Sequence, residues 1–176
     1  MCGVYFIAGI YGTGKTTVGK ELAKRVGISC YEASELIKKH NGEEYNAIKY
    51  VKDINRNQDI LVEEITKILK NEKIIILTGH FAIFNKNREV ESISSSVFKQ
   101  LGLIAIILLE SDIEKIMMHL CERDNKNYTR SELNILAEEE RKLCIEFAKQ
   151  TNTRILIHKM NYKNDVEELE MFLKNN

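Results

Sequence analysis

The sequence has no proline, no tryptophan and no excess of either charge. Lysine plus arginine and aspartate plus glutamate both number 26 in the 176 residues, so the formal net charge is zero with neutral histidine. A neutral chain lacks the overall basic field that draws proteins to nucleic acid, so nucleic acid is not an expected partner. The absence of proline and tryptophan indicates no particular function.

Cysteine is scarce and long hydrophobic runs are absent. The four cysteines are Cys2, Cys30, Cys121 and Cys144. They show no CxxC spacing, which argues against a zinc site, and isolated thiols are typical of a reduced cytosolic protein. No apolar run approaches the ~20 residues of a membrane span, and residues 9–16 interrupt the N-terminal apolar stretch too early for a signal peptide. We therefore expect one cytoplasmic domain, residues 1–176, with no membrane partner.

Five short apolar runs alternate with helical patterns along the chain. The runs cover residues 4–10, 27–31, 73–77, 103–109 and 154–158. Three of them consist almost entirely of Ile, Leu or Val, which is typical of strands buried on both faces of a parallel sheet. The alternation predicts a three-layer α/β/α domain with a five-stranded parallel sheet.

Helix patterns and two polar segments separate these runs. Helices are predicted over residues 15–26, 111–122, 129–150 and 163–174, and residues 92–96 are expected to open another. Ser111 with Glu114, and Thr129 with Glu132, have the spacing of capping boxes. A long, mostly helical insertion is expected at 32–72, a surface excursion at 84–93 and a polar connector at 123–130. The charge run at 137–142 is interpreted as a solvated helix face.

The stretch GIYGTGKT, residues 9–16, matches the phosphate-loop (Walker A) pattern G-x-x-x-x-G-K-[ST] between an apolar run and a helical pattern. Backbone N–H groups of such a loop surround phosphate oxygens, and the following helix adds its positive dipole end. Lys15 is expected to reach the β- and γ-phosphates of ATP, Thr16 to ligate Mg²⁺ and Thr17 to bind the α-phosphate. A glycine-rich turn that binds nothing is the alternative. The predicted nucleotide-binding residues are Gly9, Tyr11, Gly12, Thr13, Gly14, Lys15, Thr16 and Thr17.

The order of elements around this loop resembles the nucleoside monophosphate kinases, in particular adenylate kinases of the archaeal type and their bacterial relatives. The matching stretches are GIYGTGKTT (9–17), LTGHF (77–81), LLESD (108–112), ERD (122–124) and the EEER-containing segment 138–148. The resemblance implies a P-loop kinase fold with strand order 2-3-1-4-5, an acceptor-binding insertion at about 32–72 and a lid at about 123–130. It implies phosphoryl transfer from Mg·ATP to a nucleoside monophosphate, first AMP, by a monomer or homodimer.

The third predicted strand departs from the pattern of these kinases, which end it with an acidic residue near the Mg²⁺ water shell. Thr78 stands at that position without a negative charge, while His80 keeps its place. Either another acid serves the metal, with Glu110 as the candidate, or metal binding is weakened. His80 is a candidate contact for phosphate or acceptor, and equally a polar residue that only ends the strand.

Arginines are few near the predicted lid, although kinases of this group clamp the transferred phosphate with several of them. The cationic candidates are Arg123, Lys126, Arg130 and Arg141, and His119 stands where a relative carries a basic residue. Arg123 and Arg141 align best with the family pattern, which makes them the predicted catalytic partners of Lys15. A solvated charge on a helix face is the alternative for each.

The insertion supplies polar side chains that suit an acceptor, because a base needs an amide or backbone partner and a phosphate needs a cation. The predicted acceptor contacts are Ser34, Arg56, Gln58 and His80, with Lys49, Lys52 and Arg88 as further candidates. Solvated helix-surface positions are the alternative for most of them.

Four functions fit these residues. A nucleoside monophosphate kinase leads, and a P-loop kinase for another small acceptor follows, because a fold does not determine its substrate. A nucleotide-binding module with slow hydrolysis is a third reading, favoured by Thr78 and the few arginines. A nucleic-acid end kinase is a fourth, opposed by the neutral charge. No Asn-Lys-x-Asp motif for guanine is present, which supports adenine as the donor base.

Overall fold

A five-stranded parallel sheet in the order β2-β3-β1-β6-β7 runs through the computed structural model, which describes residues 2–40, 54–124 and 128–175. The strands are β1 (Gly3–Ala8), β2 (Ser29–Glu32), β3 (Ile74–Thr78), β6 (Leu103–Glu110) and β7 (Arg154–Lys159). They correspond to the five apolar runs, so the predicted strands and the predicted order 2-3-1-4-5 are confirmed. Every residue of β1 is buried, as expected for a central strand covered on both faces.

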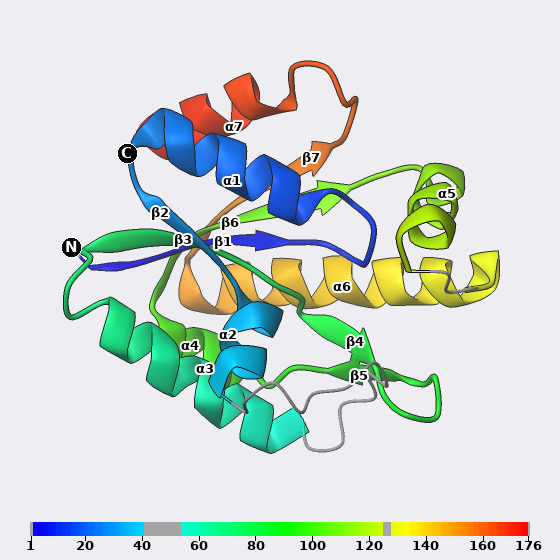
Figure 1. Cartoon of the computed structure of the whole chain (residues 1–176), viewed down its shortest axis with the longest axis horizontal. Helices are drawn as coiled ribbons and strands as arrows, with labels where there is room; N and C mark the ends of the chain where they lie inside the picture. The colour runs from blue at the N-terminus through cyan, green and yellow to red at the C-terminus, as the bar shows by residue number, and fades with distance from the viewer. Residues whose placement is uncertain (1, 41–53, 125–127, 176) are drawn as a thin grey trace.

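Helices cover both faces of the sheet (Figure 1). The bounds are α1 (Lys15–Val26) and α7 (Asp165–Lys174) on one face, and α3 (Ile54–Ile68), α4 (Ser95–Leu101) and α6 (Arg130–Thr151) on the other. Side chains of a strand alternate between its faces, so Phe6 of β1 packs into the core under α3, α4 and α6, and Ile7 packs under α1 and α7. The three-layer α/β/α prediction is confirmed.

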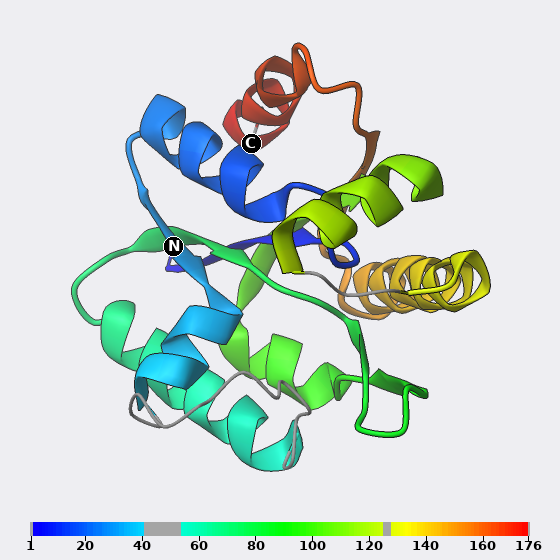
Figure 2. The same cartoon turned by 45° about the vertical axis from the view of Figure 1, so that its right-hand side comes forward.

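The remaining elements extend beyond the carboxyl ends of the strands. They are α2 (Ala33–His40), β4 (Ala82–Phe84), β5 (Val90–Ser92) and α5 (Ile113–Asp124). The expected insertion contains α2 and α3, while Lys49 and Lys52 lie outside the described residues. Strands β4 and β5 pair antiparallel, so the expected surface excursion at 84–93 is largely a β-hairpin. Figure 2 shows α5 beside the loop that follows β1.

The helix starts agree with the sequence at α6 and differ at α5. Thr129 and Glu132 form the predicted capping box: the Glu132 N–H donates to Thr129 Oγ1 over 3.2 Å, and the Thr129 N–H donates to Glu132 Oε2 over 2.7 Å. The predicted box at Ser111 is wrong. Asp112 Oδ1 accepts from the Glu114 N–H instead, because the helix begins at Ile113, and the Ser111 hydroxyl bonds the Tyr162 hydroxyl.

We expect Thr129→Ala to lower the free energy of unfolding by about 1 kcal/mol, because it removes the side-chain acceptor of the α6 capping box. Urea unfolding followed by circular dichroism measures the change. Ser131→Ala, at an exposed position in the first turn of the same helix, is the control and should stay within about 0.5 kcal/mol of the parent. Equal effects of the two substitutions would refute a capping role for Thr129.

Across the described residues, none of the helices combines the length and the apolar character that crossing a membrane requires.

Candidate active site

The phosphate loop lies at the carboxyl end of β1, where the chain turns into α1. Gly12 and Gly14 have φ angles of 77° and 89°, a left-handed conformation that residues with a Cβ rarely adopt. α1 begins at Lys15, so its unpaired N–H groups and positive dipole end face the loop. The eight predicted nucleotide-binding residues therefore lie together in this loop and the first turn of α1.

Two side chains of the loop bind its own carbonyl oxygens. Lys15 Nζ donates to Gly9 O and to Ile10 O, each over 2.8 Å. The buried Thr13 hydroxyl donates to Ile10 O over 2.9 Å, so this side chain points into the protein. Lys15 thus lies across the loop with its ammonium group at the point where phosphate oxygens are expected.

An acidic residue stands on the strand next to β3. Glu32, the last residue of β2, pairs in register with Thr78 of β3. The Thr16 hydroxyl donates to Glu32 Oε2 over 2.8 Å, and Lys20 Nζ lies 3.1 Å from Glu32 Oε1. Mg²⁺ prefers oxygen ligands and keeps much of its water, so a hydroxyl and a carboxylate side by side are a fitting partial ligand set.

Glu110, the acid suggested by the sequence, has a different partner. Its carboxylate contacts the Arg141 guanidinium, which comes from α6. Arg141 therefore reaches the carboxyl end of β6, the edge of the sheet that also carries the phosphate loop. The structure holds it against an acid at this edge.

His80 and Tyr11 form the wall of the site on the β3 side. Their rings lie 4.7 Å apart between centroids, and the Tyr11 hydroxyl accepts from the Phe84 N–H over 3.2 Å. Burial, and then the positive charge of Lys15, hold the pKa of His80 well below its usual range. The imidazole is therefore neutral at neutral pH. Its buried Nδ1 has no hydrogen-bond partner within the described part of the chain.

Glu140 is a buried carboxylate at the centre of this wall, and its exposed fraction is 1%. Oε1 accepts from the Gly9 N–H over 2.9 Å, and Oε2 accepts from the N–H groups of Phe81 and Ala82 over 2.7 and 2.6 Å. Burial raises the pKa of the Glu140 carboxyl to about 7, against the opposing effects of these donors and of the Lys15 charge. The interpretation of residues 137–142 as a solvated face is wrong for this residue.

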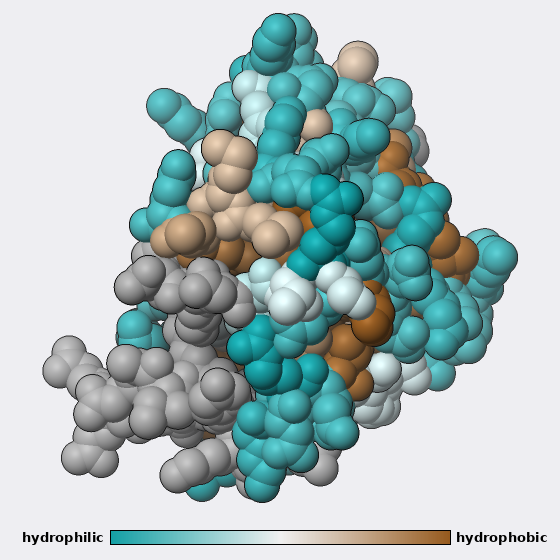
Figure 3. All heavy atoms as spheres, turned by 90° about the vertical axis from the view of Figure 1, so that its right-hand side faces the viewer, coloured by the Kyte–Doolittle hydropathy of each residue, from teal (hydrophilic) through white to brown (hydrophobic). Residues whose placement is uncertain are grey.

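The helices α5 and α6 close the site on the lid side. Ile116 and Leu120 of α5 pack with Leu133 and Leu136 of α6 in one buried cluster. Figure 3 shows this side of the molecule, where hydrophobic side chains gather in separate patches among hydrophilic ones. The predicted residue Arg123 belongs to α5, but its side chain lies outside the described part, as does Lys126.

Two arginines and one histidine of this region have acidic or backbone neighbours. Arg130 contacts the Glu114 carboxylate. Arg88 forms a bidentate pair with Glu132, with distances of 2.7 and 2.9 Å, which lowers the pKa of Glu132 to about 2. His119 Nδ1 lies 3.1 Å from Gly12 O of the phosphate loop.

The predicted acceptor residues of the insertion are separated on two helices. Ser34 is exposed on α2 and Arg56 is exposed on α3, while Gln58 is buried on α3. His80 lies closer to the phosphate loop, as its interaction with Lys15 shows. The acceptor roles of these four residues stay predictions.

A cavity of about 420 Å³ extends from the phosphate loop along the start of α1 to the turn between β7 and α7. Gly12, Gly14 and Thr17 line its loop side. Asp165 shapes the opposite side by accepting from the N–H groups of Asn161 and Tyr162 over 2.8 and 2.6 Å. The size is that of a small-ligand site.

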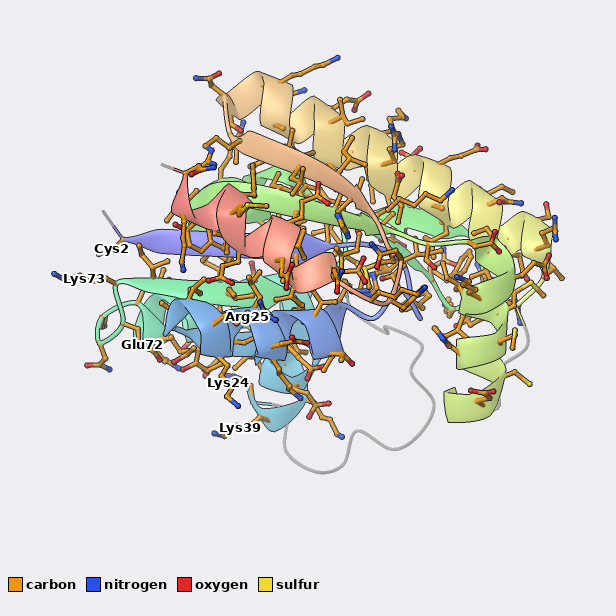
Figure 4. All side chains as sticks on the ribbon, turned by 90° about the horizontal axis from the view of Figure 1, so that it is seen from above. Cys2, Lys24, Arg25, Lys39, Glu72 and Lys73 are labelled. Carbon is orange, nitrogen blue, oxygen red and sulfur yellow. The ribbon has the colours of Figure 1, made fainter. Side chains whose placement is uncertain are left out.

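A second, open hollow lies at the opposite end of the sheet. Lys24, Glu72 and Lys73 line part of it. Figure 4 shows Cys2, Glu72 and Lys73 at the end where β1 begins, away from the phosphate loop. The chemistry-bearing side chains described above gather at the other end.

Sequence reasoning missed Glu32 and Glu140. A signal for Glu140 was present: it stands four residues after Leu136 and four before Cys144, within the apolar stripe of α6. A charge on the buried face of a helix needs partners inside the protein. Glu32 directly follows the apolar run 27–31 and ends β2 at the carboxyl edge of the sheet, where ligands of α/β proteins bind.

Kinases of small molecules are among the known proteins that this chain resembles. Shikimate kinase 1 of Citrobacter koseri is 27% identical over 153 residues, covering 83% of each chain. The structure of shikimate kinase from Acinetobacter baumannii in complex with shikimate has a TM-score of 0.63 at 18% identity, covering 98% of this chain and 91% of that one. The structure of shikimate kinase from Aquifex aeolicus has a TM-score of 0.63 at 21% identity, covering 98% of this chain and 97% of that one.

Fold and loop define the protein as a P-loop kinase, a class of phosphotransferase enzymes. A family model described as an AAA domain matches residues 8–137, so the chain belongs to that family. These relatives support the general group to which nucleoside monophosphate kinases belong. They do not support adenylate kinase in particular.

Proposed function

We propose that this enzyme transfers the γ-phosphoryl group of Mg·ATP to a small anionic acceptor, first of all a hydroxylated carboxylic acid. The proposal is carried by the gathering of Lys15, Thr16 and Glu32 at one edge of the sheet. The acceptor class is supported by the shikimate kinase that is similar over 83% of the chain.

Each side chain has a physical task in this proposal. The phosphate loop and Lys15 hold the phosphates, and the cavity between α1 and the β7–α7 turn holds the nucleoside end of ATP. Thr16 and Glu32 hold Mg²⁺, which neutralises charge that develops on the transferred group. Neutral His80 lies beside Lys15 in the wall of the site and adds no charge to it.

A nucleoside monophosphate, with AMP first, is the second candidate acceptor. The observation that favours it is Gln58, a buried amide on α3 in the insertion. An amide offers both a donor and an acceptor, which suits the edge of a base. Arg56, two residues earlier on the same helix, has the charge that a monophosphate requires.

The test is incubation of the protein with Mg·ATP and one acceptor at a time, followed by chromatography of the products. Shikimate, gluconate and the common nucleoside monophosphates form the panel, with a tube that lacks acceptor. A phosphorylated hydroxy acid supports the first proposal, and a nucleoside diphosphate supports the second. ADP formed equally in every tube would show hydrolysis without transfer and contradict both.

A further inference from the structure

Glu140 joins three segments that the proposed reaction needs. Its own helix, α6, carries Arg141 as the next residue. Oε1 accepts from Gly9, the first residue of the phosphate loop, and Oε2 accepts from Phe81 and Ala82, which directly follow His80. The three N–H donors are 131, 59 and 58 residues away in sequence, so the tertiary structure alone brings them to one carboxylate.

The contact with Gly9 reaches the lysine of the loop. Gly9 donates its N–H to Glu140 and accepts from Lys15 Nζ through its carbonyl oxygen, so one residue is held from both sides. Its φ angle is 146°, and a Cβ at this position would lie 2.7 Å from Leu109 O. A side chain therefore has no room at position 9, and the hydrogen bonds from Lys15 and to Glu140 hold the Gly9 backbone in its orientation.

We propose that Glu140 is a positioning residue: through Gly9, Phe81 and Ala82 it fixes the phosphate loop, the His80 turn and helix α6 relative to one another in the form that binds Mg·ATP. A carboxylate is the side chain that this place requires, because all of its partners are donors. Glutamine has the same shape, but its NH₂ group would oppose one set of N–H donors. A buried donor without an acceptor is costly, so the segments would separate or shift.

The ionisation of the surrounding groups leaves Glu140 as the one that changes charge near neutrality. Its charged neighbour is Lys15 of the phosphate loop. Its titratable neighbours are Tyr11 of the same loop, His80 of the β3–β4 turn and Cys144 of α6. Burial raises the pKa of Tyr11 and of Cys144 and lowers that of His80, so these three are neutral at pH 7. Protonation of Glu140 replaces one acceptor by an O–H donor. Affinity for Mg·ATP should therefore fall as the pH is lowered through about 7.

The experiment compares Glu140→Gln with the parent by titration calorimetry of Mg·ATP. We expect the Kd of the variant to rise about tenfold, as for other residues that orient a ligand-binding group. Glu138→Gln, exposed on the same helix, is the matched control and should stay within about twofold. The ratio of the variant's Kd to that of the parent should shrink toward one as the pH is lowered from 8 to 6, because only the parent has the titrating carboxyl. Titration of ATP itself affects both proteins equally and cancels in the ratio.

Unchanged or tighter binding of Mg·ATP by a folded Glu140→Gln protein would overturn the inference. So would a ratio that does not vary with pH, which would leave only a structural role.

If Glu140→Gln does not fold, hydrogen exchange of the parent protein is the test. The Gly9, Phe81 and Ala82 amides should gain protection together when Mg·ATP binds. Protection that changes independently at the three amides would refute the coupling. The inference rests on the proposed function only through Mg·ATP binding. A parent protein that binds Mg·ATP but phosphorylates no acceptor would therefore contradict the proposed function and leave the Glu140 test in force.

Discussion

Lys15→Ala should reduce phosphoryl transfer by at least about 10²–10³-fold, the loss expected when one preorganised charged donor is removed from a developing anion. The side chain is placed for this role because its Nζ lies at the phosphate loop and binds Gly9 O and Ile10 O over 2.8 Å. Alanine leaves the backbone cradle in place but removes the cation that spans it. Turnover with the best acceptor of the panel, together with the Kd for Mg·ATP, measures the loss.

The fold should survive this substitution. Lys15 stands at the first position of α1, and its Nζ donates to two carbonyl oxygens of its own loop. We therefore expect the free energy of unfolding to change by no more than about 2 kcal/mol. Lys24→Ala, an exposed position on the same helix, is the control and should retain full activity. Unchanged turnover of Lys15→Ala would overturn the whole site.

Glu32→Gln should raise the Mg²⁺ concentration for half-maximal activity by about 10–100-fold. Glutamine can still accept from the Thr16 hydroxyl, so the contact of 2.8 Å can persist while the negative charge disappears. The substitution therefore removes the negative charge of the proposed carboxylate ligand while it keeps the shape of the side chain. Activity measured across a Mg²⁺ titration at fixed ATP gives the shift.

Glu35→Gln, three residues further on and exposed on α2, is the control for a general loss of negative charge. Its Mg²⁺ dependence should match that of the parent. A Glu32→Gln protein with parental Mg²⁺ dependence would show that the carboxylate on β2 does not serve the metal. Glu110, which ends β6 and contacts Arg141, would then be the next acid to test.

The strands and the phosphate loop follow from local sequence. Runs such as residues 103–109 are apolar without interruption, which is typical of a strand covered on both faces, and β6 occupies Leu103–Glu110. The loop requires glycine at positive φ and a lysine at the start of a helix, and each is a property of neighbouring residues. The order 2-3-1-4-5 followed from family resemblance, because strand order is a long-range property.

Caps and hairpins show the limit of local reasoning. Ser111 and Asp112 have similar capping ability, so the first turn of α5 can begin at either. In the folded protein the Ser111 hydroxyl bonds the Tyr162 hydroxyl instead of the helix, and Asp112 caps α5. The β4–β5 hairpin likewise has only three residues in each strand, too few for a clear alternating pattern.

By itself the sequence determined that this protein is an α/β domain with a phosphate loop, because apolar continuity, glycine at positive φ and the Gly-Lys-Thr order are local properties. Only the tertiary structure decided which carboxylates belong to the site. Glu32 meets Thr16 because β2 ends at the edge of the sheet where α1 begins, and Glu140 meets Gly9 across 131 residues. The charge of a glutamate is visible in any sequence, but its partners are set by packing, and the partners determine whether it is solvated or part of the site.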